Sequence, residues 1–326
     1  MPGLKDRLEA VGYTLGWKLV CKLPESWADR VFRFFADLAW RREGPSVRTL
    51  ETNLVRVLGP DVDGKALRAL SRQAMRSYAR YWLEVFRLPV MPVDRLVDGM
   101  RTEGPFETAF AELAGGRGII FALPHMGNWD QAGAWLVANG AGSIATVMER
   151  LKPESVYEKF VAFREGLGME VLPASGGARP FGVLAQRLRA GKVVVLVADR
   201  DVTGTGIEVD FFGEKCMMQH GAAALALQTG AALRPAVLWF EEDGWGARIG
   251  AEITVPAVGS RREQSAAMMQ EVARFFEDGI REHPEDWHML QPIFTADLDP
   301  TRQAAAKERA GRTGSATGQL TGQEVP

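Results

Sequence analysis

The feature that most constrains this chain is an alternation of segments that begins near residue 116. Short β-branched segments bounded by glycine or proline alternate there with stretches of helical periodicity, which is typical of helices layered on a sheet. The expected strands are 118–123, 143–148, 169–172, 193–198, 207–212, 235–240 and 247–255. The expected helices among and after them are 129–139, 154–167, 180–190, 221–229 and 266–283. We therefore predict an α/β fold whose central mixed sheet is flanked by helices.

Residues 1–102 have a different character, with apolar and basic side chains at helical spacing. Between 4 and 42 this periodicity is interrupted at Pro24, and the second half places Trp27 and other aromatic residues among several arginines. A further helix is expected over 64–88, and the whole region carries 18 basic against 12 acidic side chains. Amphipathic helices of this kind suit an anionic lipid surface, but they equally suit packing against the rest of the domain.

The chain divides into three parts on these patterns. An N-terminal amphipathic helical region spans 1–102, and an α/β core spans 103–300. The last segment, 301–326, is rich in Gly, Thr, Gln and Ala and has no periodic apolar residues. Such a segment has no apolar face to bury, so we predict a disordered tail there.

Composition excludes several classes of protein. The net charge of -2 argues against a strongly basic nucleic-acid-binding domain, so no nucleic-acid partner is expected. Cys21 and Cys216 are too few for a disulfide framework or a thiolate metal site. The most apolar stretch, 222–240, is interrupted by polar residues, glycine and proline, and acidic residues near the start argue against a secretory leader. Any membrane contact should therefore be peripheral.

The most informative segment for chemistry is 121–130, which reads FALPHMGNWD. A strand is expected to end at the proline, so that His125 occupies the turn and Asp130 stands where a helix begins. Turns at the carboxyl ends of strands commonly carry the active sites of open α/β folds. Asp130 could accept a hydrogen bond from one ring nitrogen and leave the other as a general base. The same pattern also fits a capping or core arrangement.

Asp199 and Asp201 follow another expected strand and allow two interpretations. They could form strand-end ion pairs, or they could be the Asp-x-Asp pair of a metal-dependent glycosyltransferase that holds a divalent ion against a diphosphate. No recognised metal-ligand spacing connects the other histidines, which are His220, His283 and His288. A dinucleotide-binding Gly-x-Gly-x-x-Gly turn is also missing from the sequence.

Several blocks of sequence together resemble a known family. The blocks are PHMGNWD at 124–130, ADRD at 198–201, VDFFG at 209–213 and PEDWHMLQ at 284–291. Spread over about residues 5–300, they resemble bacterial lipid acyltransferases of the lipid A lauroyl/myristoyl transferase superfamily. Within it, the blocks ERLKPESVY at 149–157 and SGGARP at 175–180 are most similar to the actinobacterial phosphatidylinositol mannoside acyltransferases.

The resemblance implies transfer of a long, palmitoyl-like chain from acyl-CoA to a mannose hydroxyl of a phosphatidylinositol mannoside or a related glycolipid. It also implies a peripheral protein at the cytoplasmic face of the cell membrane. An acyl chain must be shielded from water, so the apolar residues of the lipid-associated N-terminal third are candidate walls of an acyl groove, with packing in the core as the alternative for each. His125 would act as general base, with acyl-CoA as co-substrate and no cofactor or metal. The sequence has no Gly-x-Ser-x-Gly elbow, which fits direct transfer without an acyl-enzyme.

The resemblance assigns roles to other residues as well. An acidic residue after a buried strand works with the histidine in this subgroup, and Asp199 matches it. Members of the subgroup often have glutamate there, so both Asp130 and Asp199 stay open as the partner of His125. The positions that contact the acyl donor or line its site are matched by Arg164, Thr205 and Gln228. A lipid-binding protein that kept the fold and lost the chemistry is a further alternative.

Overall fold

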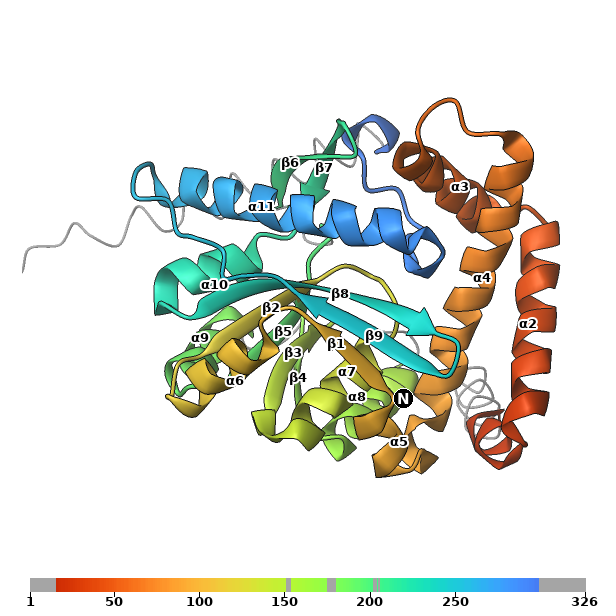
Figure 1. The fold of residues 1–326 in the computed structure, drawn as a ribbon, viewed down its shortest axis with the longest axis horizontal. Coiled ribbons are helices and arrows are strands. Elements are labelled where there is room, and N and C mark those ends of the chain that lie inside the picture. The colour runs from red at the N-terminus through yellow and green to blue at the C-terminus, as the bar shows by residue number, and fades with distance from the viewer. Residues whose placement is uncertain (1–15, 151–153, 175–179, 202–203, 205, 299–326) are drawn as a thin grey trace, which may run out of the picture.

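The computed structural model describes residues 16–150, 154–174, 180–201, 204 and 206–298. The predicted tail at 301–326 lies outside the described residues, as does the beginning of the first predicted helix. A seven-stranded sheet with helices on both faces forms the centre of the molecule (Figure 1). In spatial order its strands are β1 (Met100–Glu103), β9 (Gly244–Ile249), β8 (Ala232–Glu241), β2 (Ile119–Leu123), β5 (Val193–Val197), β3 (Ile144–Met148) and β4 (Met169–Pro173).

The sheet is mixed, as predicted. Its neighbouring strands are parallel except for β8 and β9, which form an antiparallel hairpin. One face is covered by α9 (Pro180–Arg189), α10 (Gly221–Thr229) and α11 (Arg261–Glu282). The other face is covered by α5 (Val93–Asp98), α6 (Phe106–Ala114), α7 (Trp129–Leu136) and α8 (Glu154–Gly166). Successive side chains of a strand point to opposite faces, so Ile120 enters one apolar core while Ile119 and Phe121 enter the other.

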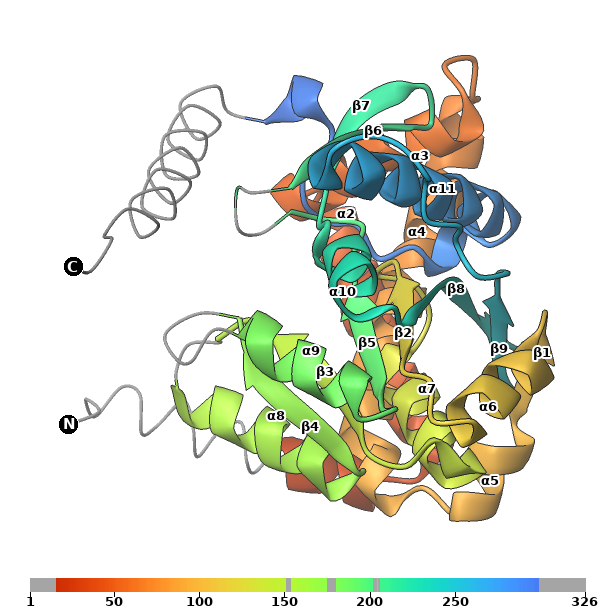
Figure 2. The same cartoon turned by 90° about the vertical axis from the view of Figure 1, so that its left-hand side faces the viewer.

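The strand predicted at 207–212 is present, but it does not join the central sheet. Instead β6 (Ile207–Phe211) pairs with β7 (Glu214–Met218) in a two-stranded antiparallel sheet. Figure 2 shows this hairpin beside α11. The sequence predicts neither β1 nor β7, because MRTE and EKCMM lack a run of β-branched residues.

The described residues that precede α5 include the long helices α2 (Glu25–Arg41), α3 (Pro45–Leu58) and α4 (Gly64–Arg87). Figure 1 shows α4 at the end of the sheet and α2 running along the outside of α4. Ala28 and Ala36 of α2 are buried, whereas Trp27, Phe34 and Phe35 are 60%, 62% and 60% exposed. Both predicted uses of the helix are therefore compatible with its packing, since one face is covered and an aromatic face is free. Among the described helices, none is both long enough and apolar enough to cross a bilayer.

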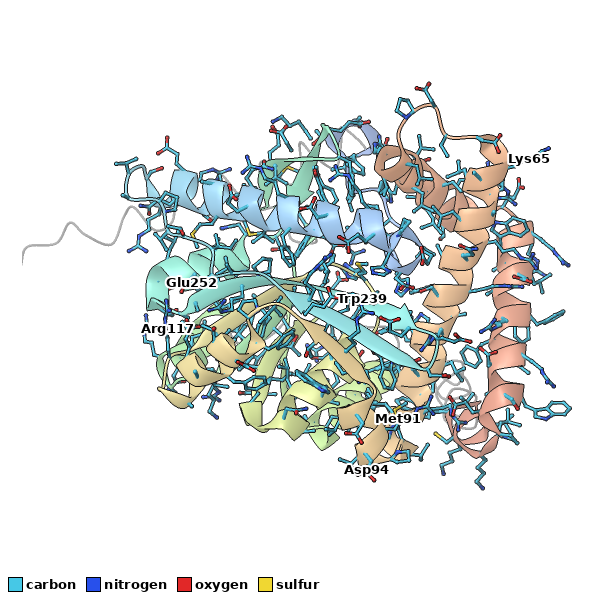
Figure 3. The ribbon with its side chains drawn as sticks, in the orientation of Figure 1. Lys65, Met91, Asp94, Arg117, Trp239 and Glu252 are labelled. Atoms are coloured by element: carbon cyan, nitrogen blue, oxygen red, sulfur yellow. The ribbon has the colours of Figure 1, made fainter. Side chains whose placement is uncertain are left out.

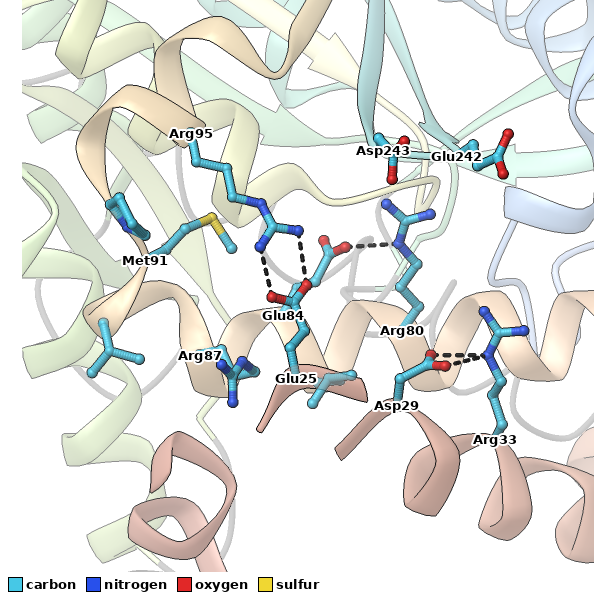
Figure 4. Close-up of a pocket in the computed structure, with 13 residues that line it drawn as sticks. Glu25, Asp29, Arg33, Arg80, Glu84, Arg87, Met91, Arg95, Glu242 and Asp243 are labelled. Carbon is cyan, nitrogen blue, oxygen red and sulfur yellow. Dashed lines mark hydrogen bonds and ion pairs between the residues drawn. The ribbon is translucent and has the colours of Figure 1, made fainter. Parts of the chain in front are cut away.

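Ion pairs connect α2 to α4 and to α5. Arg76 and Arg72 of α4 both bond to Asp37, and these hydrogen bonds hold the pKa of that carboxyl far below its usual range. Near the other end of α2, Arg95 pairs with Glu25 at 2.7 Å. This second pair lines a charged cleft of about 240 Å³ that also includes residues of α4 and the β8–β9 turn (Figure 4). The attachment of α2 thus combines ion pairs with apolar contacts, in which Ala28 and Ala36 are buried and Trp40 packs against the cluster of α3 and α4.

Candidate active site

The turn after β2 presents His125 at the carboxyl edge of the sheet. Gly127 in this turn has a φ of 58°, and a Cβ there would come within 2.7 Å of the Leu238 backbone. Glycine therefore lets the turn lie close against β8. Asn128 then caps α7, because its side chain accepts a hydrogen bond from the Gln131 N–H at 3.0 Å. The side chain of His125 is 28% exposed, although both of its neighbours in the sequence are buried.

His125 is paired with Asp199. Strands β2 and β5 are parallel neighbours, with Leu123 opposite Val197, so the residues two positions beyond each strand meet at the same edge. Nδ1 of His125 lies 2.6 Å from Oδ1 of Asp199, and the His125 backbone N–H donates to Oδ2 at 2.9 Å. An ionised carboxylate only accepts hydrogen bonds, so Nδ1 carries the hydrogen and Nε2 is left to accept a proton.

Asp199 is fully buried beneath the imidazole. Its Oδ2 also accepts a hydrogen bond from Nε1 of Trp287 at 3.1 Å. Burial by itself raises the pKa of this carboxyl, but the charge of His125 and the hydrogen bonds from His125 and Trp287 outweigh burial and hold the pKa below its usual value. The shorter aspartate therefore reaches the histidine directly, as an ionised and fixed partner.

Asp130 is engaged elsewhere. Its Oδ1 accepts from Nε of Arg164 at 2.5 Å, and its Oδ2 accepts from Nη2 of Arg164 at 3.1 Å and from the Tyr81 hydroxyl at 2.9 Å. The side chains of Asp130 and Arg164 are only 1% and 11% exposed. This corrects the predicted bond between His125 and Asp130, because a charge-assisted bidentate arginine from α8 has taken the carboxylate. Arg164 is likewise committed to Asp130 rather than presented to an anion.

Comparison with known proteins places this chain in one family. A model of the family described as bacterial lipid A biosynthesis acyltransferase matches residues 8–296. The chain belongs to this family. It is 47% identical over 305 residues to a phosphatidylinositol mannoside acyltransferase of Mycolicibacterium smegmatis, over 92% of this chain and 96% of the relative. A protein of the same name from Mycobacterium tuberculosis (strain CDC 1551 / Oshkosh) is also 47% identical, over 91% of this chain and 92% of the relative.

In this acyltransferase, a segment from near the end of the chain packs against the turn that carries His125. Met126 forms an isolated antiparallel bridge with Trp287, and the backbone N–H of His288 donates to the His125 carbonyl at 2.7 Å. The sequence supplies the PEDWHMLQ block only as a mark of the family and assigns Trp287 no role. A tryptophan in such a block suggests a buried indole N–H donor. Its spacing does not indicate that the acceptor is Asp199, which lies 88 positions earlier in the sequence.

The structure does not bring Gln228 to His125. Gln228 is exposed near the end of α10. The carbonyl of Gly230, just beyond this helix, accepts a hydrogen bond from Arg117 at 3.5 Å. Arg117 stands at the amino end of β2, as Figure 3 shows beside its ion-pair partner Glu252, whereas His125 follows the opposite end of that strand. Gln228 thus lies toward the amino end of β2, at the end of the sheet opposite His125.

Asp201 and Asp199 do not face a common site. Asp201 accepts hydrogen bonds from the backbone N–H of Gly206 at 2.8 Å and from the Gln219 side chain at 2.9 Å. Asp199 instead accepts a hydrogen bond from the His125 ring. Within the described ranges, the acidic and histidine side chains close enough to share a metal are those of His283, Glu285 and Asp286. The Asp-x-Asp interpretation therefore has no support in the geometry. Thr205, in the same loop, lies outside the described residues.

Proposed function

We propose that this acyltransferase moves a long acyl chain from acyl-CoA to a mannose hydroxyl of a phosphatidylinositol mannoside. The observation that carries the chemistry is the pair of His125 and Asp199, which leaves Nε2 of a partly exposed imidazole as the proton acceptor. The acceptor is taken from the relatives, whose names specify it and whose similarity covers 92% of the chain in the M. smegmatis protein.

The reaction uses His125 twice. Nε2 removes the proton of the mannose hydroxyl while the oxygen attacks the thioester carbonyl carbon, which forms the new C–O bond. Asp199 stabilises the imidazolium that results, through the hydrogen bond at Nδ1. The tetrahedral intermediate then collapses, the C–S bond breaks, and the imidazolium returns its proton to the departing thiolate. The products are the acylated glycolipid and free coenzyme A, and the histidine is regenerated.

The thiols of the protein favour direct transfer over an acyl-enzyme. Cys216 is fully buried, and burial, together with the charge of Asp199, raises the pKa of its thiol. Burial also raises the pKa of the Cys21 thiol. Because the thiolate is the nucleophilic form, a raised pKa disfavours both thiols as nucleophiles. The base is therefore expected to activate the acceptor itself.

An apolar cavity beside the histidine turn is the proposed site for the acyl chain. It lies between the sheet and α7, and its walls include Leu123, Trp129 and Ala132. The Trp129 ring also lies 5.7 Å from the His125 ring, so this wall of the cavity stands beside the histidine. At about 30 Å³ the cavity is too small for a long chain. The surrounding side chains must therefore move when the donor binds, with half-buried Trp129 as the wall nearest the histidine.

The free face of α2 is the proposed membrane contact. Trp27, Phe34 and Phe35 are exposed on it, and exposed Arg30 and Arg41 share the same helix. Aromatic side chains can enter the headgroup region while arginines meet anionic lipid. A peripheral position at the cytoplasmic face of the cell membrane would place the active site next to both a glycolipid and soluble acyl-CoA.

Product analysis tests this function. The purified protein is incubated with palmitoyl-CoA and vesicles that contain phosphatidylinositol mannoside, and the lipids are analysed by mass spectrometry. The proposal expects one added palmitoyl group on the mannose, with one free coenzyme A for each acylated lipid. Acyl transfer to other glycolipids but not to this one would refute the acceptor, and activity with acyl carrier protein but not with palmitoyl-CoA would refute the donor.

A further inference from the structure

His288 is a buried polar residue for which the mechanism above has no use. It is 4% exposed, and its imidazole lies among the rings of Tyr78, Tyr81, Trp129 and Phe240. Burial, with a smaller effect from the charge of His125, lowers the pKa of His288 to about 3. The ring is therefore neutral at physiological pH, with one N–H donor and one bare nitrogen.

One nitrogen of this ring ends a buried hydrogen-bonded chain. Nε2 of His288 lies 2.8 Å from the Ser77 hydroxyl, which in turn lies 2.6 Å from Oδ1 of Asp286. The other oxygen of Asp286 accepts from the Phe240 backbone N–H at 2.8 Å. Ser77 comes from α4, so the chain connects the N-terminal helices to the segment that closes the histidine turn. The bond between Ser77 and Nε2 therefore holds the His288 ring in a defined orientation.

The proton arrangement in this chain has two forms. Burial raises the pKa of Asp286 to about 7, although the hydrogen bonds from the Phe240 backbone and from Ser77 oppose this effect. When Asp286 is ionised, Ser77 donates to it and Nε2 of His288 donates to Ser77, so Nδ1 is bare. When Asp286 is protonated, it donates to Ser77, which donates to Nε2, so Nδ1 carries the hydrogen. Near neutral pH, Nδ1 is thus an acceptor in one form and a donor in the other.

The second nitrogen, Nδ1, is buried and has no hydrogen-bond partner within the part of the chain that the structure describes. Native proteins rarely leave such an atom unpaired, so it calls for an explanation. His288 is also fixed close to the reacting group. Its backbone bonds to the His125 carbonyl at 2.7 Å, and both imidazoles lie against Trp129, at ring distances of 5.7 and 6.4 Å.

We propose that His288 binds the acceptor, with Nδ1 making its missing hydrogen bond to a hydroxyl of the acceptor sugar. This inference rests on the proposed function, since it requires a sugar beside His125. A hydroxyl fits because it can both donate and accept, so it completes either form of the Ser77 chain. A thioester carbonyl only accepts, and it would be matched by one form alone.

Two matched substitutions separate the roles of the two nitrogens. The amide of His288→Asn keeps a polar atom near the position of Nδ1, whereas that of His288→Gln keeps one near Nε2. Binding of the deacylated phosphatidylinositol mannoside headgroup is measured by calorimetry, which requires no turnover. The inference expects about tenfold weaker binding by His288→Gln and a smaller loss by His288→Asn, with the KM for palmitoyl-CoA unchanged in both.

The reverse order of affinities, or headgroup binding equal to wild type in both variants, would overturn the inference. A headgroup that does not bind the wild-type protein would overturn it too. If either variant folds poorly, Ser77→Ala gives a further measurement, because it leaves Nδ1 in place and should bind the headgroup almost as tightly as wild type. Headgroup binding without acyl transfer by the wild-type protein would count against the proposed function alone, which keeps the two failures distinct.

Discussion

His125 and Asp199 are 74 positions apart in the sequence, yet Nδ1 of the histidine lies 2.6 Å from Oδ1 of the aspartate. Two adjacent parallel strands create this contact, because each residue stands two positions beyond the end of its strand. The sheet therefore fixes the backbone on both sides of the pair. Such support holds a catalytic base in one tautomer and one orientation.

Removing the indole donor to Asp199 should change the pH dependence of catalysis. Trp287→Phe leaves Oδ2 with the His125 backbone as its remaining donor, which destabilises the carboxylate and raises the lowered pKa of Asp199. His125 and Asp199 are in contact and titrate as a pair, so the acidic limb of log kcat/KM reports protonation of that pair. It should therefore move up by about 1 to 2 pH units, as expected for the loss of one hydrogen bond to a charged group. Rates with palmitoyl-CoA between pH 4 and 9 measure this shift.

Trp245→Phe is the matched control. Trp245 is also buried, and its indole also donates to a carboxylate, Glu84, at 2.7 Å, but it does not touch the pair of His125 and Asp199. This variant should lose stability without moving the acidic limb. Equal shifts in both variants, or none in Trp287→Phe, would argue against a role for Trp287 in holding Asp199.

The buried pair of Asp130 and Arg164 should matter chiefly for stability. Asp130→Asn leaves the guanidinium of Arg164 buried without a counter-charge, which should lower the free energy of unfolding by about 3 to 5 kcal/mol. Because Asp130→Asn/Arg164→Met removes both charges, it should recover most of this loss. Urea unfolding of the two variants measures the difference, and a double variant less stable than the single one would contradict the explanation.

The aromatic face of α2 should govern binding to lipid. Replacing Trp27, Phe34 and Phe35 by serine removes exposed apolar side chains and should weaken binding to anionic vesicles at least about tenfold. Binding of the wild-type protein should also fall with added salt, because arginines meet the lipid charge. Val258→Ser is a control, since Val258 is 82% exposed on the connection before α11. Vesicle sedimentation measures both effects, and equal binding by the triple variant and the control would exclude this face.

A larger side chain in the apolar cavity should change the choice of acyl chain. Ala132 lines the cavity, so Ala132→Phe should favour lauroyl-CoA over palmitoyl-CoA relative to wild type. A matched control is Ala111→Phe, because Ala111 is exposed on α6. Competition assays with mixed donors give the ratio of the two products. An unchanged ratio in Ala132→Phe would place the acyl chain elsewhere.

The sequence predicts features that depend on neighbouring residues better than features that depend on contacts between distant segments. Alternating periodicities indicate the layered fold and place His125 and Asp199 at strand ends, because these are properties of consecutive residues. The partners of Asp130 come from α4 and α8, and no local pattern reports such a contact. The position of Gln228 depends on the strand order, in which β8 lies beside β2, and that order is not encoded in spacing.

The most direct test of the central claim is the rate of acyl transfer by His125→Ala, from palmitoyl-CoA to phosphatidylinositol mannoside in vesicles. His220→Ala serves as the control, because the ring of His220 contacts Ser265, whereas Asp199 is bonded to His125 and Trp287. The general-base mechanism predicts a rate at least about 100-fold below wild type for His125→Ala, with folding retained and the control active. A folded His125→Ala protein that transfers palmitate at the wild-type rate would contradict the account.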